Sequence, residues 1–132
     1  MLYKASNAGV KVRLLVRGIC CLVAGVEGQS ENIFITSIVG RFLEHARVYI
    51  FGTSENEKMY IGSADWMTRN LDNRIEVIAP ILDPDIYKKV RNTIQLQLDD
   101  DVKARIIDEN QVNEFVAKSD KESSQMLIYH SL

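Results

Sequence analysis

The sequence predicts an α/β domain with a central mixed β-sheet flanked by helices. Several β-rich runs are bounded by glycine and polar residues, as at Ile33–Val39. An amphipathic helix is predicted from Pro84, because apolar residues recur after it at regular intervals; these are Ile86, Val90, Ile94 and Leu98. The length of 132 residues and the hydrophobic content of 46% fit one domain, which we expect over residues 1–132.

The amino-terminal part predicts the end of a helix and two strands. The helix ends at a glycine cap, Gly9, so the chain is expected to begin inside an element and to be a piece of something longer. Val10–Val16 alternates apolar and basic residues, which predicts a strand and places Arg17 at its carboxyl end. Ile33–Val39 is β-branched throughout much of its length and predicts a strand buried on both faces.

A β-hairpin is predicted next, from Ala46–Phe51 and Lys58–Ile61 around the polar turn GTSENE. His45 precedes the first strand and Ser63 follows the second. Antiparallel pairing therefore brings His45 and Ser63 to the same end of the hairpin.

The remaining elements are a short helix, two strands and a final helix. The short helix extends through Asn70 and is expected to be capped by Ser63 or Asp65, whose side-chain oxygens can accept the free amide hydrogens of a first turn. The other three elements are predicted at Arg74–Ile81, at Val102–Ile107 and from about Lys121.

Composition excludes several classes of protein. A net charge of −2 provides no global field for nucleic acid, so an anion site has to be local. The adjacent Cys20 and Cys21 lack the spacing of zinc or redox motifs and predict buried or half-buried thiols in a reducing compartment. The longest apolar run, Gly18–Val26, is far shorter than the roughly 20 residues of a membrane span. We expect a cytoplasmic protein with no nucleic-acid partner.

His45 and Arg47 are the first candidate site residues. Two residues apart on one strand, they point to the same face. An imidazole can act as nucleophile, base or acid, and a guanidinium pairs bidentately with phosphate oxygens. A histidine at a bend is, however, more often structural or merely exposed, so the spacing alone leaves both interpretations open.

Three other features are given structural interpretations. Asp99, Asp100 and Asp101 follow a helix and predict a solvated turn rather than a metal site. Trp66 and Met67 are expected in the core. His130, near the chain end, has no predicted partner and no expected catalytic role.

Three longer segments carry a family resemblance. LLVRGICCL, SIVGRFLEHARVYIFG and MYIGSADWMTRNLDNRIEVIAPILDP together resemble the carboxyl-terminal region of the long polyphosphate kinases, which polymerise the terminal phosphate of ATP. The resemblance runs from about Tyr3 to Ile107. It implies a phospholipase D-like fold, whose signature is His-x-Lys, then an Asp, then Gly-Ser-x-Asn. Here Arg47 replaces the lysine, Gly52 the acid and Asp65 the asparagine, which argues against phosphodiester hydrolysis.

The resemblance also implies roles for individual residues. The chain would be the second of two such catalytic domains, a carboxyl-terminal fragment of a larger polyphosphate kinase. His45 would be the catalytic acid or base that assists a phosphohistidine on the missing domain. The implied ATP-site and phosphate-site residues are Arg17, His45, Arg47, Ser63, Asp65 and Arg74.

The same resemblance implies substrates and partners. These are ATP or ADP, inorganic polyphosphate, and the remaining domains of a protein expected to be a homo-oligomer, with membrane association of the full-length enzyme left open. Mg²⁺ is implied for the full-length enzyme, with ligands outside this fragment. The fragment alone is expected to be inactive.

Two alternatives stay open. One is a phospholipase D-like phosphodiesterase that acquires a second His-x-Lys half from a dimer partner. The other is a non-catalytic polyanion-binding or assembly module, which a buried or carbonyl-bound His45 turned away from the arginines would favour.

Overall fold

The computed structural model describes residues 1–131, without the side chain of Ser54. They form two compact units, one made of residues 1–44 and 93 onward and the other of residues 45–92. The expected single domain over residues 1–132 stays a prediction.

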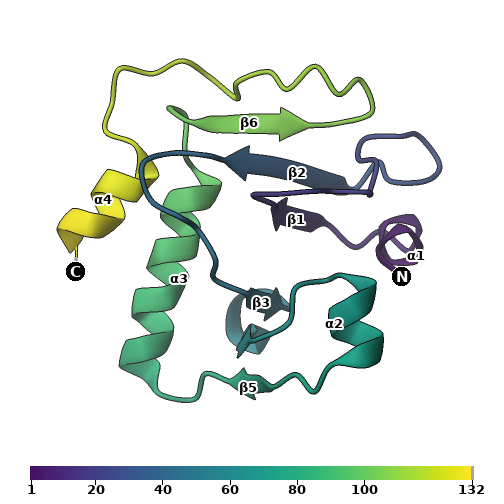
Figure 1. Cartoon of the computed structure of the whole chain (residues 1–132), viewed down its shortest axis with the longest axis horizontal. Helices are drawn as coiled ribbons and strands as arrows, with labels where there is room; N and C mark the ends of the chain where they lie inside the picture. Colours follow the sequence, from purple (N-terminus) through teal and green to yellow (C-terminus); the bar gives the residue numbers. More distant parts are fainter. Residues whose placement is uncertain (132) are drawn as a thin grey trace. The chain divides into compact units, whose positions relative to one another are not determined.

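The first unit contains a mixed three-stranded sheet in the order β1-β2-β6 (Figure 1). Its strands are β1 (Val12–Leu15), β2 (Ile33–Ile38) and β6 (Ala104–Ile107). β1 pairs with β2 in parallel, and β2 pairs with β6 antiparallel. The prediction of an α/β fold with a mixed sheet is confirmed in this unit.

The core of the first unit lies on one face of β2. Ile33 and Ile35 are 1% and 2% exposed, and Ala24 packs with them. Between the two isoleucines, Phe34 is 58% exposed because successive side chains point to opposite faces of a strand. The prediction that this strand is buried on both faces is therefore wrong at Phe34, whereas Ile38, on the same face, is 6% exposed.

Helix α1 (Leu2–Asn7) packs beside β1 and β2 and ends as predicted. Gly9 follows it with a φ of +82°, a conformation that glycine adopts without steric cost. Buried Ser6 then fixes the approach to β2: its hydroxyl accepts the Asn32 N–H at 3.1 Å, and its carbonyl accepts from Asn32 Nδ2 at 3.0 Å.

The second unit contains a separate antiparallel sheet, β3-β4-β5. The predicted hairpin is confirmed as β3 (Val48–Phe51) and β4 (Lys58–Gly62), with a 3-10 turn, η1 (Ser54–Asn56), between them. Within residues 1–131, these strands pair only with one another. The expectation of one central sheet is thus corrected to two small ones, because alternating patterns define strands but not their partners.

Two predicted boundaries in the second unit are also wrong. α2 (Thr68–Asn73) begins after Met67 and has no side-chain cap. β5 (Ile78–Pro80) is much shorter than the predicted strand, since its register covers only Tyr60 to Gly62 of β4. Arg74 therefore follows α2 and precedes the strand.

Helix α3 (Pro84–Leu98) begins at proline, as predicted. Asp83 Oδ1 accepts the backbone N–H groups of Asp85 and Ile86, each at 2.9 Å, and so caps the first turn. The final helix α4 (Ser124–Ser131) begins slightly later than expected. Among residues 1–131, no helix combines the length and the apolar character that a membrane span requires.

Candidate functional site

The candidate site lies at one end of the β3–β4 hairpin. The Gly62 N–H donates to the Arg47 carbonyl at 2.9 Å, which extends the pairing beyond β3 and joins the His45-x-Arg47 segment to the chain leaving β4. The predicted approach of the His45 segment to the Ser63 segment is thereby confirmed.

Asp65 binds the guanidinium of Arg47. Its Oδ1 lies 3.0 Å from Arg47 Nε and 2.9 Å from Nη2. The side chains are 23% exposed for Arg47 and 30% for Asp65, so the ion pair is only partly open to solvent. Asp65 therefore forms an ion pair with Arg47 and does not cap α2. The prediction that Ser63 or Asp65 caps this helix is wrong, because α2 has no side-chain cap.

Arg47 also contacts His45 twice. Nη2 lies 2.8 Å from the His45 ring Nε2, and Nη1 donates to the His45 carbonyl at 3.3 Å. Since a guanidinium only donates, Nε2 accepts, and the proton of the neutral ring lies on Nδ1. His45 Nε2 is 3.9 Å from Asp65 Oδ1, and the imidazole is 55% exposed.

These contacts occupy most of the N–H groups of Arg47. The Nε and Nη2 edge, which could bind a phosphate bidentately, faces Asp65 and His45, and Nη1 donates to the His45 carbonyl. In this arrangement Arg47 orients the imidazole by a hydrogen bond, and the carboxylate of Asp65 balances its positive charge.

Ser63 belongs to a second group, with Glu76 and Asn70. Its hydroxyl donates to Glu76 Oε2 and accepts the Val77 N–H at 3.0 Å, and Asn70 Nδ2 donates to Glu76 Oε1 at 2.8 Å. Hydrogen bonds from Ser63 and then Asn70, followed by the charges of Arg74 and Arg47, hold the pKa of Glu76 below its usual value.

The sequence prediction missed Glu76. The available signal was an acid two residues after Arg74 in an otherwise apolar segment, RIEVIA. Arg74 itself is exposed at the end of α2, with an extended backbone, and acts on Glu76 through its charge.

Arg17 lies in the first unit. It is exposed just beyond β1, at the strand's carboxyl end as predicted. Its grouping with His45 stays a prediction.

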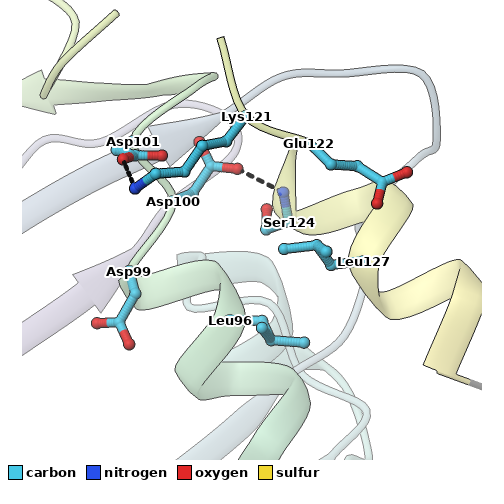
Figure 2. A pocket seen from close by; sticks show the side chains of 8 residues that line it. All are labelled: Leu96, Asp99, Asp100, Asp101, Lys121, Glu122, Ser124 and Leu127. Carbon is cyan, nitrogen blue, oxygen red and sulfur yellow. Dashed lines mark hydrogen bonds and ion pairs between the residues drawn. The ribbon is translucent and has the colours of Figure 1, made fainter. Parts of the chain in front are cut away.

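Asp99, Asp100 and Asp101 follow α3, and two of them bind residues at or near the start of α4 (Figure 2). Asp100 is 6% exposed and points toward the start of α4, where Ser124 N–H donates to Oδ2 at 2.8 Å. The predicted solvated turn is therefore wrong for Asp100. Asp101 pairs with Lys121 Nζ at 2.7 Å.

Hydrogen bonds keep Asp100 ionised despite its burial. Burial raises its pKa, but donation from Ser124 and from the backbone N–H groups of Lys103 and Ala104 outweighs this effect, and the pKa lies below its usual value. Within residues 1–131, no group of three or more histidine, cysteine or acidic side chains could hold a metal ion. We assign no magnesium ligand to these residues.

Several minor expectations are corrected. Trp66 and Met67 are 58% and 41% exposed rather than in the core, and Trp66 stacks on Tyr49. His130 Nδ1 has a partner, Glu122, at 3.1 Å. Cys20 is half-buried as expected, whereas Cys21 is exposed; both are free thiols.

Comparisons with known proteins agree on one family. The model of polyphosphate kinase C-terminal domain 2 matches residues 1–126. The polyphosphate kinase of Vibrio parahaemolyticus is 50% identical over 99% of this chain and 19% of its own length, and that of Escherichia coli K12 is 49% identical over 97% and 19%.

A solved structure supports the same grouping. The crystal structure of polyphosphate kinase from Porphyromonas gingivalis matches with a TM-score of 0.90 and 43% identity, over 98% of this chain and 20% of that one. The chain thus spans about a fifth of the length of these relatives.

Proposed function

Because this chain belongs to the polyphosphate kinase C-terminal domain 2 family, we propose that it supplies part of the catalytic centre of an ATP:polyphosphate phosphotransferase. Its relatives are about five times longer, so the activity belongs to the full-length protein and the chain alone is inactive. The fold is phospholipase D-like, with His45-x-Arg47 and Ser63-x-Asp65 as its altered signature.

The reaction proceeds in two reversible steps. The bond between the terminal phosphorus of ATP and its bridging oxygen breaks as a histidine nitrogen on another domain bonds to that phosphorus, and ADP leaves. The terminal oxygen of polyphosphate then attacks the phosphorus and the P–N bond breaks. His45 exchanges a proton with the departing or attacking group in these steps.

The exposed, arginine-bound imidazole of His45 carries this proposal. Its side chain is 55% exposed, and its Nε2 lies 2.8 Å from Arg47 Nη2. A structural role would be favoured by a buried ring turned away from the arginines, which is the opposite arrangement. The contact therefore supports an acid–base role over a purely structural one.

Phosphate charge is stabilised by arginines of the chain. Arg17 and Arg74 are exposed and carry permanent charge, and Arg47 is a further cation in contact with His45. Ser63 contributes through its hydrogen bond to Glu76, and Asp65 contributes through its ion pair with Arg47. We also propose that the protein is cytoplasmic and homo-oligomeric, and that it contacts ATP, polyphosphate and its own remaining domains.

Replacing His45 in the full-length protein tests the proposal. His45→Ala should lower both polyphosphate synthesis from ATP and ATP formation from polyphosphate by roughly 10²–10⁴-fold, the usual contribution of general acid–base catalysis. His130→Ala is the matched control, since His130 is equally exposed but paired with Glu122. Equal activity of the two variants would overturn the role of His45.

A further inference from the structure

The carboxylate of Asp65 lies near both the guanidinium of Arg47 and the imidazole of His45. Its Oδ1 binds Arg47 at 2.9 Å and lies 3.9 Å from His45 Nε2. The same Nε2 accepts from Arg47 Nη2 at 2.8 Å. One carboxylate oxygen, one guanidinium nitrogen and one ring nitrogen therefore form a compact group.

The group must rearrange when His45 takes up a proton. Nε2 is the ring nitrogen that lacks a proton in the neutral form, so a proton is added there. A protonated Nε2 no longer accepts from Arg47 Nη2, and it becomes a donor that needs an acceptor. Asp65 Oδ1, 3.9 Å away, is a carboxylate oxygen within ion-pair distance of it.

We propose that Asp65 is a positioning residue that couples the protonation of His45 to the availability of Arg47 for phosphate. With neutral His45, Asp65 holds the guanidinium against Nε2. When Nε2 is protonated, Asp65 accepts the new N–H, and Arg47 Nη2 turns from the ring toward a phosphate oxygen. The proton moves from the reacting group to Nε2 and back, so no other reactant is required. This inference rests on the proposed function of His45.

Other charged groups near the pair do not replace Asp65. Glu76 interacts with Arg47 through its charge but is hydrogen-bonded to Ser63 and Asn70. Glu44, the neighbour of His45 in sequence, accepts from Gln125 Nε2 at 2.9 Å. Asp65 is thus the acid that contacts both Arg47 and, at 3.9 Å, the ring.

A double-mutant cycle in the full-length protein tests the coupling. Asp65→Asn keeps the size of the side chain but removes its charge, and should lower kcat by about 10- to 100-fold, a share of the acid–base contribution. The KM for ATP should change much less, and the alkaline limb of the kcat–pH profile should move to lower pH. In a His45→Ala background, Asp65→Asn should lower kcat much less, because only the ion pair with Arg47 is then lost and not the coupling to His45.

Two further variants complete the test. Asp65→Glu restores the charge and should recover part of kcat and of the pH profile. Asp72→Asn, on the exposed surface of α2, is the matched control and should leave activity unchanged.

Each outcome bears on a different claim. If His45→Ala is inactive but Asp65→Asn keeps wild-type kcat and pH profile, or lowers activity equally in both backgrounds, the coupling is overturned while the proposed function stands. If His45→Ala is fully active, the proposed function fails, and the coupling fails with it.

Discussion

Asp100 and Ser124 are joined by a hydrogen bond from the Ser124 N–H to Asp100 Oδ2 at 2.8 Å, across 24 residues of sequence. The other carboxylate oxygen accepts the N–H groups of Val102, Lys103 and Ala104 at 3.0, 2.6 and 2.8 Å. One buried side chain thus shapes the turn from α3 into β6 and caps the first turn of α4.

Removing this carboxylate should destabilise the first unit. Asp100→Ala leaves several backbone donors near the buried site without an acceptor, and we expect the free energy of unfolding to fall by about 2–4 kcal/mol. Urea unfolding followed by circular dichroism measures the change. Asp99→Ala is the control, since Asp99 is exposed and its side chain accepts a surface hydrogen bond from Gln95; it should cost about 0.5 kcal/mol or less.

The lowered pKa of Asp100 also predicts how stability depends on pH. The carboxyl is more acidic in the folded state than its ordinary value of 3.8, so the folded protein holds fewer protons than the unfolded chain in this range. Its contribution is fully present above that value and is lost as the pH falls through the lower folded pKa. Unfolding free energies measured between neutral pH and pH 3 should fall less steeply for Asp100→Asn than for the wild type. Parallel curves would contradict this assignment.

The local elements could be predicted from the sequence because their signals are local. The hairpin follows from two β-rich runs around GTSENE, and α3 follows from Pro84 and a regular apolar spacing. Antiparallel pairing then places the His45 and Ser63 segments at one end without further information.

The partners of the polar side chains could not be predicted in the same way. An aspartate such as Asp65 can cap a helix or pair with an arginine, and the choice depends on α2 beginning only at Thr68. The burial of Asp100 likewise depends on α4, which returns from a distant part of the chain. In both cases the local sequence allows two roles for the side chain, and a contact with a residue distant in sequence decides between them.

Ser63 should control the ionisation of Glu76. Its hydroxyl bond is the largest cause that lowers the pKa of this carboxyl, ahead of the bond from Asn70. Ser63→Ala should therefore raise the pKa of Glu76 toward its ordinary value of 4.5, as measured by NMR titration of the side-chain carboxyl. Thr68→Ala, in the exposed first turn of α2, should leave the titration unchanged. An unaltered Glu76 titration in Ser63→Ala would show that the hydroxyl bond does not hold the carboxylate.

Arg17 and Arg74 should act on substrate binding more than on the proton transfer. Both are exposed permanent cations, and a charge-assisted hydrogen bond to phosphate contributes roughly 1.5–3 kcal/mol. In the full-length protein, Arg17→Gln and Arg74→Gln should each raise the KM for ATP or polyphosphate by about 10- to 100-fold, and kcat should change less than in His45→Ala. Lys11→Gln and Lys88→Gln remove an exposed positive charge from the same two units and serve as controls. If an arginine variant and its lysine control raise KM equally, the effect comes from net charge, and that arginine is not a phosphate ligand.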